Sequence, residues 1–342
     1  MGLSDYYVGC DLGGTKILSV IYDAVFEPIG RARNKTKGHE GQEFGLKRIG
    51  DTIEEAMDDA GIATSKPGSI GIGCPGPLDL NRGIIREAPN LGWVDAPVKS
   101  SLEARFSCPV TVANDVDLGV YGEYRFGAGQ GYRCVVGLFP GTGIGGGCVY
   151  QGEIFRGNVT SCMEVGHIQI MADGPHDGAG NAGTLEALAS RLRVAAEAAQ
   201  AVYRGQAPAL RRKAGMDISE IRSGALAHAV ENGDEAVIRI IENAAEYLGV
   251  GIVTLVHLLA PDVVIMGGGM VEALPELIVK TARKSAKQRV LPSYRDQFEV
   301  VAAKLGDDAA VMGAAAWGRH SLEVAASDGG SRQKVTRAET KR

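Results

Sequence analysis

The sequence predicts an α/β protein of two lobes. The evidence is the length of the chain, the alternation of strands and helices along it, and a strand–glycine turn–strand pattern that occurs twice. The chain has 342 residues, and single cores stop growing at roughly 250 residues, so two domains are expected. Hydrophobic residues make up 45% and charged residues 23%, which is typical of a chain that buries enough apolar surface to fold.

The first half of the chain begins with two strands that a glycine turn joins. Residues 6–11 end in this turn, and the apolar run Ile17–Tyr22 follows at once, which is the pattern of a strand hairpin. Apolar residues recur at helical spacing from Phe44 to Ala60, and Gly61 marks the end of that helix. The other elements expected here are a strand at Ser69–Cys74, a helix at Ala96–Phe106 and a strand at Pro109–Ala113.

The second half repeats the hairpin pattern. Strands are expected at Cys134–Phe139 and Gly145–Tyr150, on either side of a second glycine-rich turn. An apolar stripe from Asp234 to Ala260 predicts a helix that lines a core. The other elements expected here are helices at Val116–Phe126, Thr184–Tyr203, Ile218–Glu231, about Ala273–Gln288 and about Asp308–Leu322, and strands at Val263–Met266 and Phe298–Ala302.

The order of these elements sets the expected lobe boundaries. Residues 1–115 with about 305–322 are predicted to form a smaller lobe, and residues 116–304 a larger one. Two similar α/β lobes, each with a glycine turn, predict a cleft between them. The tail at 327–342 is polar and charged, so it is predicted to be disordered.

Charge and cysteine content narrow the function. Lys and Arg number 36 against 41 Asp and Glu, a net charge of -5, so nothing draws the chain generally to nucleic acid or to an anionic membrane. A small-molecule partner is favoured. The longest apolar run, Leu248–Ala260, is shorter than the roughly 20 residues of a membrane span. The six cysteines lie singly and no basic, apolar leader precedes the first strand, so reduced thiols and a cytoplasmic location are expected.

Two glycine-rich segments match the spacing of a dinucleotide-binding loop, but their surroundings do not. The segment Gly71–Gly76 runs into prolines, and Gly141–Gly146 runs into another strand. A dinucleotide-binding loop instead lies between a strand and a helix. The sequence also contains no Gly-Lys pair, so it lacks the loop of P-loop nucleotidases.

Glycine-rich hairpin turns can bind phosphate in another way, because consecutive backbone N–H groups can point at one anion. The segments 11–16 and 141–143 are such turns, although a purely structural hairpin explains either one alone equally well. Asp11 adds an oxygen donor suited to Mg²⁺, usually through water, and Lys16 could neutralise phosphate charge. The residues expected at the phosphates are Asp11, Gly13, Gly14, Thr15, Lys16, Gly141, Thr142 and Gly143.

Taken in order, these motifs resemble those of the ROK kinases, sugar kinases within the actin, hexokinase and Hsp70 ATPase superfamily. The resemblance covers roughly residues 6–320 and includes Gly267 and Gly268 after the strand Val263–Met266, which look like the family's adenosine motif. It implies a two-lobed actin-like ATPase fold (ribonuclease H-like) with an interlobe cleft. It also implies ATP and Mg²⁺ as cofactors and a homodimer.

The resemblance further implies a sugar site. The pair Asn114-Asp115 matches the family's Asn-Asp pair, in which the carboxylate is the catalytic base and the asparagine a sugar ligand. One carboxylate suffices as base, because phosphoryl transfer depends mainly on positioning and charge neutralisation. The alternative role for either residue is a helix N-cap. The residues expected at the sugar are Gly76, Asn90, Asn114, Asp115, Glu164, His167 and Glu186. Alternatively, the two glutamates are solvated surface charges and the histidine is a core residue.

One part of the family pattern is missing. ROK proteins usually bind a structural zinc through the histidine of Glu-x-Gly-His and three cysteines spaced C-x-C-x₄-C. Those cysteine positions are Asp177, Ala179 and Thr184 here, so no bound zinc is expected, even with His167 and His176 in the sequence. Packing and hydrogen bonds are then expected to hold the loop 173–184, and His167 is available to the sugar.

The predicted reaction is transfer of the γ-phosphoryl group of MgATP to a hexose, namely to the 6-hydroxyl of glucose, with Asp115 as general base. Kinases of N-acetylmannosamine, N-acetylglucosamine or fructose are the near alternatives. A sugar-sensing regulator is more distant, because such family members carry an N-terminal helix-turn-helix, whereas the first strand is expected by Tyr6 here. A sugar-binding protein without catalysis is also possible, but the phosphate motifs and Asp115 argue against it.

Overall fold

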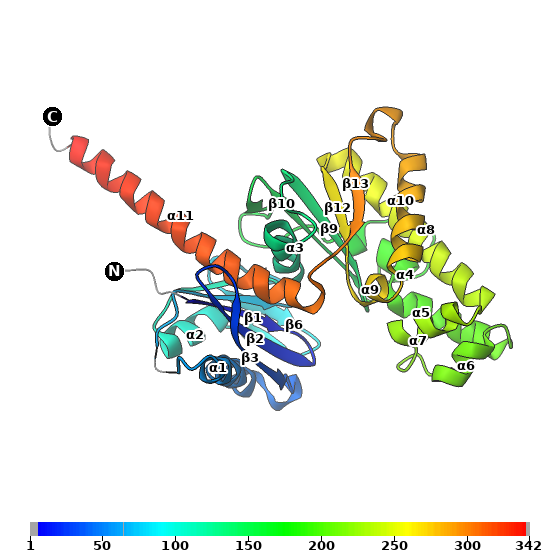
Figure 1. Ribbon diagram of the computed structural model, residues 1–342, viewed down its shortest axis with the longest axis horizontal. Helices are drawn as coiled ribbons and strands as arrows, with labels where there is room; N and C mark the ends of the chain where they lie inside the picture. Colours follow the sequence, from blue (N-terminus) through cyan, green and yellow to red (C-terminus); the bar gives the residue numbers. More distant parts are fainter. Residues whose placement is uncertain (1–5, 64, 340–342) are drawn as a thin grey trace. The chain divides into compact units, whose positions relative to one another are not determined.

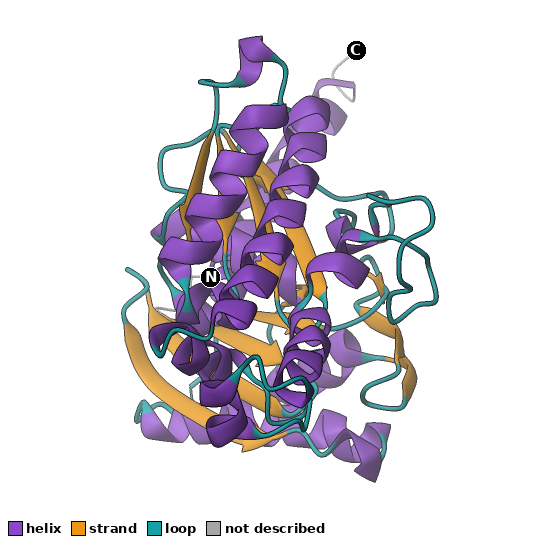
Figure 2. Ribbon diagram, turned by 90° about the vertical axis from the view of Figure 1, so that its right-hand side faces the viewer, coloured by secondary structure: helices purple, strands orange, loops and turns teal. Residues whose placement is uncertain are grey.

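The chain folds into two compact α/β units, shown along the sequence in Figure 1. The computed structural model describes residues 6–63 and 65–339. Unit 1 consists of Met1–Arg125, Arg156–Cys162 and Asp307–Arg342, and unit 2 of Phe126–Phe155 and Met163–Gly306. Each unit is built on a five-stranded sheet that helices flank (Figure 2).

The sheet of unit 1 has the strand order β3-β2-β1-β4-β8. Strands β1, β2 and β3 form an antiparallel meander, and β4 and β8 run parallel to β1. Alternate residues of β1, such as Val8 and Cys10, lie in a core with Ile49 and Ile53 of α1. The elements of unit 1 are β1 (Tyr6–Leu12), β2 (Lys16–Asp23), β3 (Pro28–Lys35), η1 (Gly38–Glu40), α1 (Gln42–Asp59), β4 (Ile70–Cys74), β5 (Leu78–Asp79), β6 (Ile84–Ala88), β7 (Trp93–Ala96), α2 (Val98–Phe106), β8 (Val110–Asn114), α3 (Asp115–Phe126), η4 (Gly306–Asp308) and α11 (Ala309–Glu339).

Helix α11 packs on this sheet at unusually short range. A Cβ atom added at Gly9 of β1 would lie 1.9 Å from the Val311 carbonyl oxygen, and one added at Gly71 of β4 would lie 1.8 Å from that of Ala314. Only residues without a Cβ atom allow the helix backbone to rest on the strands at this distance. Gly9 and Gly71 are therefore packing residues, so the contact with α11 explains the first glycine of the segment Gly71–Gly76 without a dinucleotide.

Helix α3 belongs to unit 1, whereas the sequence placed it in the larger lobe. Glycines again explain the packing, because a Cβ atom at Gly313 of α11 would lie 1.8 Å from the Leu118 carbonyl oxygen. One at Gly122 of α3 would lie 2.2 Å from the Ala309 carbonyl oxygen. The segment Arg156–Cys162 also returns to unit 1. Sequence periodicity could not show these assignments, because they depend on contacts between distant segments.

The end of α11 also differs from the sequence-based expectation. The helix was expected to stop near Leu322, but it continues to Glu339 and so includes most of the tail predicted to be disordered. No proline occurs between residues 323 and 339, so the backbone has no obligatory break there. Residues 340–342 lie outside the described residues, and disorder at this end of the chain stays a prediction.

The sheet of unit 2 has the order β11-β10-β9-β12-β13. Its pattern is that of unit 1, with an antiparallel meander followed by two strands parallel to the central one. The repeated hairpin of the sequence is thus a repeated sheet topology. The elements of unit 2 are β9 (Cys134–Pro140), β10 (Ile144–Tyr150), β11 (Glu153–Ile154), η2 (Val165–His167), α4 (Leu185–Ala189), α5 (Arg191–Tyr203), α6 (Pro208–Ala214), α7 (Ser223–Glu231), α8 (Glu235–Leu259), β12 (Val263–Met266), α9 (Gly269–Ala273), α10 (Pro275–Arg289), η3 (Pro292–Tyr294) and β13 (Glu299–Ala302).

The long helix α8 forms the centre of the unit 2 core, as its apolar stripe predicted. Its buried face includes Ile241, Leu248 and Ile252. Close packing on α10 requires Gly249, where an added Cβ atom would lie 2.4 Å from the Ser285 Cβ atom. Neither α8 nor any other helix within residues 6–63 and 65–339 is long and apolar enough to cross a membrane.

The cysteines are thiols, and most of them are core residues. Burial raises the pKa of the Cys10 thiol to about 12 and that of Cys108 to about 11. Burial also raises the pKa of Cys74 well above its usual value. Cys10, Cys74, Cys108, Cys134 and Cys148 are buried, and Cys162 is partly exposed.

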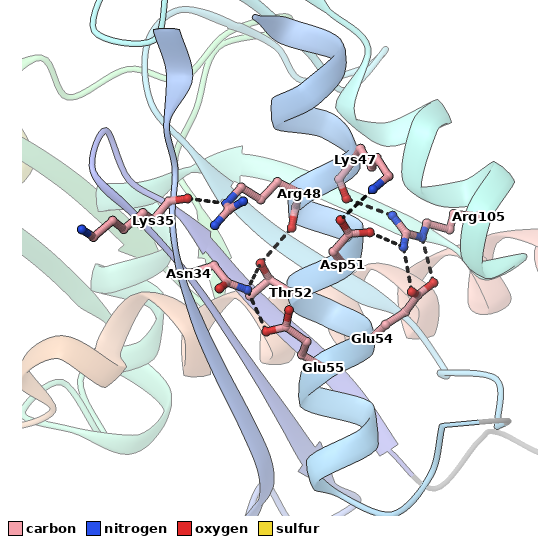
Figure 3. A network of polar contacts seen from close by, with 9 residues as sticks. All are labelled: Asn34, Lys35, Lys47, Arg48, Asp51, Thr52, Glu54, Glu55 and Arg105. Carbon is pink, nitrogen blue, oxygen red and sulfur yellow. Dashed lines mark hydrogen bonds and ion pairs between the residues drawn. The ribbon is translucent and has the colours of Figure 1, made fainter. Parts of the chain in front are cut away.

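Arg105, near the end of α2, connects this helix to α1 (Figure 3). Its Nε and Nη2 atoms donate to the two carboxylate oxygens of Glu54 at 2.8 and 2.7 Å, and Nη2 also donates to Asp51 at 2.6 Å. Its Nη1 atom donates to the Lys47 carbonyl at 2.9 Å. The guanidinium group lies against Gly50, where an added Cβ atom would be 2.2 Å from Nη1. One arginine therefore fixes the contact between two helices.

We expect Arg105→Met to lower the free energy of unfolding by about 1 kcal/mol at neutral pH. The hydrogen bond from Arg105 lowers the pKa of Asp51, against the opposing effect of partial burial. A carboxyl group with a lowered folded-state pKa stabilises the fold above its unfolded pKa, near 4, and loses this contribution as the pH falls through the folded value. The stability difference from wild type should therefore be constant from about pH 7 to 5 and shrink below about pH 4.

Thermal unfolding of wild type, Arg105→Met and the control Arg212→Met across this pH range measures the effect. Arg212 is exposed on α6, so its variant should match wild type throughout. If the stability difference between Arg105→Met and wild type is the same at pH 3.5 and pH 7, the ion pairs of Arg105 are not its cause.

Candidate active site

Two aspartates lie at the carboxyl ends of the parallel strands of the unit 1 sheet. Strand β4 pairs in parallel with β1 and β8, which aligns Asp11 with Gly73 and Gly73 with Ala113. Asp115 follows two residues later, at the start of α3. Gly73 leaves room between the aspartates, because an added Cβ atom would lie 3.2 Å from the Asp115 Cα atom. Strand ends thus bring together the predicted metal-binding carboxylate and the predicted base.

The environment of Asp11 favours a bound cation. Burial raises the pKa of its carboxyl group from 3.8 to about 7, the charges of Asp115 and Asp307 add to the rise, and Lys16 opposes it. A buried carboxylate beside other carboxylates is stabilised by a nearby divalent ion. Within the described residues no group of three or more His, Cys, Asp or Glu side chains could hold a metal by itself. The site therefore fits Mg²⁺ that arrives with a nucleotide, since Mg²⁺ commonly combines one or two carboxylates with phosphates and water.

The first glycine turn is held firmly from one side. Gly13 N–H donates to the Lys16 carbonyl at 2.9 Å, as in a hairpin. The hydroxyl of Thr36 donates to the Gly13 carbonyl at 2.7 Å, and its N–H donates to the Thr15 carbonyl at 3.0 Å. Gly14 and Thr15 are nevertheless exposed. Hydrogen bonds thus hold the turn while its tip stays accessible, as binding of a phosphate would require.

Lys16 does not project freely from this turn. Its ammonium group pairs with Asp307 at 3.0 Å, and Asp307 also lies 3.6 Å from the Arg33 guanidinium group. Such a partly exposed pair is worth only about 0 to 1 kcal/mol. A phosphate group can therefore compete with Asp307 for the Lys16 charge.

Asn114 caps helix α3, and Asp115 is the first residue of that helix. The Asn114 side-chain oxygen accepts hydrogen bonds from the N–H groups of Val116 at 2.9 Å and Asp117 at 3.2 Å. One Asp115 oxygen accepts from Val116 N–H at 3.0 Å. The N-cap role considered from the sequence is therefore present. It is compatible with a role as base, since a carboxylate offers about four acceptor sites.

Two further residues of the expected sugar site lie in unit 1. Asn90 lies beside the first phosphate turn, because a Cβ atom added at Gly14 would be 3.9 Å from the Asn90 Cβ atom. Gly76 has a φ angle of 82°, and an added Cβ atom would lie 2.2 Å from the Glu87 carbonyl oxygen. Gly76 is thus required by the shape of its loop, and only its backbone can contact a ligand.

The second glycine turn, in unit 2, is supported by Glu186. Gly141 N–H donates to the Gly143 carbonyl at 2.8 Å. The Glu186 carboxylate accepts from Ile144 N–H at 2.9 Å, and a Cβ atom at Gly143 would lie 2.2 Å from the same carboxylate oxygen. The sequence assigned Glu186 to the sugar, and the structure places its carboxylate directly against the phosphate turn.

Arg191 also contacts this turn, and the sequence did not indicate it. Its N–H donates to the Gly141 carbonyl at 2.9 Å, and its Nη2 atom donates to the Thr142 hydroxyl at 2.7 Å. It is the first residue of α5. No motif surrounds it, so only the fold shows that a positive charge lies at the second phosphate turn.

The third glycine segment lies next to the end of β9. A Cβ atom added at Gly267 would be 2.8 Å from the Phe139 ring, and one at Gly268 would be 3.0 Å from the Pro140 carbonyl oxygen. Gly268 also has a φ angle of 83°. Because Gly141 follows Pro140, unit 2 places the predicted adenosine segment beside the second phosphate turn.

Glu164 precedes the short helical turn η2, His167 ends it, and the turn packs against β10. A Cβ atom at Gly146 of that strand would be 2.6 Å from a Val165 methyl group, and one at Gly166 would be 2.3 Å from the Ile144 carbonyl oxygen. Glu164 and His167 are both exposed. This contact explains the glycine of the Glu-x-Gly-His motif and places the short turn against Ile144, the residue that follows the second predicted phosphate turn.

The three positions where cysteines are usual do not form a zinc site. Asp177 accepts hydrogen bonds from His167, Thr184, Ala179 and Asn181. Ala179 has no ligating atom in its side chain, and the Thr184 hydroxyl donates to Asp177 at 3.0 Å. These residues do not fit a zinc ion, which requires four electron-pair donors, typically thiolates and imidazoles.

The chain is similar to known proteins over most of its length. Residues 7–321 match the ROK family. The chain is 31% identical to a glucokinase from Thermotoga maritima over 309 residues, which are 90% of this chain and 95% of the relative. It is 30% identical to a putative xylose repressor from Caldicellulosiruptor over 310 residues, 90% of this chain and 77% of that one.

A solved structure gives the same result for the fold. The ROK family glucokinase from Streptomyces griseus, in complex with glucose and AMPPNP, superposes with a TM-score of 0.80 at 30% identity, covering 92% of this chain and 99% of the other. The predicted fold class is therefore confirmed. The chain belongs to the ROK family and has the two-lobed actin-like ATPase fold.

Proposed function

We propose that this sugar kinase transfers the γ-phosphoryl group of MgATP to the 6-hydroxyl of glucose. The observation that carries the proposal is that Asp11 pairs with Gly73 and Asp115 lies against the same glycine, beside a hydrogen-bonded and accessible glycine turn. A carboxylate suited to Mg²⁺ and a second one at a helix start are the two acidic groups that such a transfer needs.

Each group has a defined task in the proposed reaction. Asp115 accepts the proton of the sugar hydroxyl while that oxygen bonds to the γ-phosphorus, and ADP leaves with the electrons of the broken P–O bond. Asp11 would hold the Mg²⁺ of MgATP, which would neutralise charge on the phosphates. Lys16 and Arg191 supply positive charge to the phosphates. The backbone groups assigned to the nucleotide belong to Gly13, Gly14, Thr15, Gly141, Thr142, Gly143, Gly267 and Gly268.

The sugar is proposed to contact side chains from both halves of the sequence. The side chains proposed for the sugar are those of Asn90, Asn114, Glu164, His167 and Glu186, together with the backbone of Gly76. The glucokinase relatives and the similar structure solved with glucose and AMPPNP support glucose and ATP. A homodimer and a cytoplasmic location stay predictions.

A panel of sugars with ATP, read by coupled detection of ADP, tests the proposal. Glucose should give the highest kcat/KM among glucose, N-acetylmannosamine, N-acetylglucosamine and fructose. A higher value for another hexose would replace glucose but keep the kinase. Sugar binding without ADP release for every sugar would instead favour a sugar-sensing protein, the activity class of the repressor relative.

A substitution of Glu186 can distinguish between two roles, namely support of the turn assigned to ATP and contact with the sugar alone. Glu186→Ala leaves the Ile144 N–H without its acceptor and frees the phosphate turn, so the KM for ATP should rise about tenfold. A residue that only bound sugar would change the KM for glucose and not that for ATP. Initial rates with each substrate varied measure both constants, and Glu220→Ala, at an exposed position of the same unit, should leave both within twofold of wild type.

A further inference from the structure

We propose that the Asp177 carboxylate, rather than a metal ion, organises the loop 168–184 and orients His167 for the sugar. Asp177 is then a positioning residue, and this inference rests on the sugar kinase proposed above. The carboxylate then takes the structural place of the missing zinc ion in a loop without cysteines.

The carboxylate of Asp177 has a complete set of hydrogen bonds. One oxygen accepts from His167 Nδ1 at 2.8 Å and from the Thr184 hydroxyl at 3.0 Å. The other accepts from the N–H groups of Ala179 and Asn181, both at 2.9 Å. The side chain has no exposed surface. Since a carboxylate offers about four acceptor sites, each of them is used inside the loop.

The polarity of this centre is the reverse of a zinc site. A zinc ion is a cation that four electron-pair donors surround, whereas Asp177 is an anion that four N–H and O–H donors surround. The same positions are involved, since Asp177, Ala179 and Thr184 stand where cysteines are usual and His167 is the remaining ligand position. Burial opposes the charge of Asp177, but the hydrogen bonds from His167, Asn181, Thr184 and Ala179 lower its pKa below the usual range.

Backbone contacts close the loop around this carboxylate. Asp177 N–H donates to the Asn181 carbonyl at 2.9 Å, and Gly180 N–H donates to the Asp177 carbonyl at 3.1 Å. At the base of the loop, Gln169 and Thr184 form a bridge. The loop is thus closed by backbone hydrogen bonds around a charged centre, while Ile168 and Ile170 pack against the core of unit 2.

Thr184 links this centre to the phosphate turn. Its hydroxyl donates to Asp177 and also accepts from Ala187 N–H at 3.3 Å, so it is the N-cap of helix α4. The second residue of α4 is Glu186, whose carboxylate binds Ile144 N–H. One short helix therefore connects the loop of His167 to the turn assigned to ATP.

The contact with Asp177 determines how His167 presents its ring. A carboxylate accepts from Nδ1, so Nδ1 carries a proton and the Nε2 atom of the neutral ring is an acceptor. The His167 side chain is 40% exposed, so a ligand can reach it. Nε2 is then suited to accept a hydrogen bond from a sugar hydroxyl. Without Asp177, the ring would no longer be held in this tautomer or in this orientation.

The first experiment compares Asp177→Asn with the control Asp173→Asn, an exposed aspartate of the same loop. Asparagine presents an NH₂ group to donors that require an acceptor. The KM for glucose should rise at least about tenfold while kcat falls less than about threefold, and the control should resemble wild type. Equal losses in kcat and in the KM for both substrates would indicate general misfolding and overturn the positioning role.

Nitrogen NMR of the histidine rings gives a readout that does not depend on turnover. With ¹⁵N-histidine labelling, His167 should show the Nδ1-protonated tautomer in wild type at a pH where the ring is neutral, and a mixture of tautomers in Asp177→Asn. A wild-type ring protonated at Nε2 would overturn the inference even if the enzyme phosphorylates glucose. The expected NMR result would stand even if no sugar were phosphorylated.

The second experiment restores the metal. A chain with Asp177→Cys, Ala179→Cys and Thr184→Cys should bind about one zinc ion, because these residues with His167 form a Cys₃His set. Its KM for glucose should be within about threefold of wild type with zinc and rise after chelation. Wild type should contain less than about 0.1 zinc per chain and keep its activity in chelator, and stoichiometric zinc in wild type would overturn the proposal.

Discussion

Asp115→Asn should lower kcat at least about a thousandfold while glucose binding stays measurable. A positioned general base contributes roughly 10² to 10⁴ in rate, and asparagine cannot accept the proton of the hydroxyl. Asparagine can still accept the hydrogen bond from Val116 N–H that Asp115 accepts at 3.0 Å. The start of α3 should therefore be preserved, so a loss of rate would reflect chemistry rather than unfolding.

Two measurements separate binding from turnover for this variant. Isothermal titration with glucose gives its dissociation constant, and coupled detection of ADP gives kcat. Asp58→Asn, an exposed aspartate of α1, is the matched control and should keep both values. If Asp115→Asn retained a tenth or more of the wild-type rate, the base would have to be another group.

The largest expected effect on stability comes from Gly71→Ala. The new Cβ atom would lie 1.8 Å from the Ala314 carbonyl oxygen and 2.4 Å from its carbon. Both belong to the backbone of α11, so no side-chain rotation can relieve the clash. The helix would have to move away from β4, and a loss of about 3 kcal/mol or more in the free energy of unfolding is expected.

Urea unfolding followed by tryptophan fluorescence measures this loss where it occurs, because both tryptophans, Trp93 and Trp317, are buried in unit 1. The control is Gly224→Ala in α7. An added Cβ atom there meets no atom within 4 Å, so a small gain of about 0.5 to 1 kcal/mol is expected. An unchanged midpoint for Gly71→Ala would contradict the close packing of α11 on the sheet.

The sequence was a good guide wherever the signal is local. Both glycine hairpins, the long helix α8 and the fold class were predicted, because turn residues and apolar periodicity are properties of neighbouring residues. Strand β3 was missed, since Pro28–Lys35 contains few apolar residues and lies at a sheet edge. The lobe that contains α3 was also misassigned, because the glycine contacts between α3 and α11 join segments about 190 residues apart.

The candidate site shows the same division. Asp11 and Asp115 could be selected from motifs, but their proximity follows from the parallel pairing of β4 with β1 and β8. The contact of Arg191 with Thr142 and that of Glu186 with Ile144 have no sequence signature. They depend on where a side chain points after its helix is packed. The four donors around Asp177 are of this kind too, although the missing cysteines indicated where to look.

The distribution of the thiols has a practical consequence for spectroscopy. Alkylating reagents attack the thiolate of accessible cysteines, and five of the six thiols are buried, whereas Cys162 is partly exposed. Under native conditions a maleimide dye should therefore label the chain at Cys162 without prior removal of any cysteine. Because Arg156–Cys162 belongs to unit 1, the natural sequence already provides one attachment point for a fluorescent reporter on that unit.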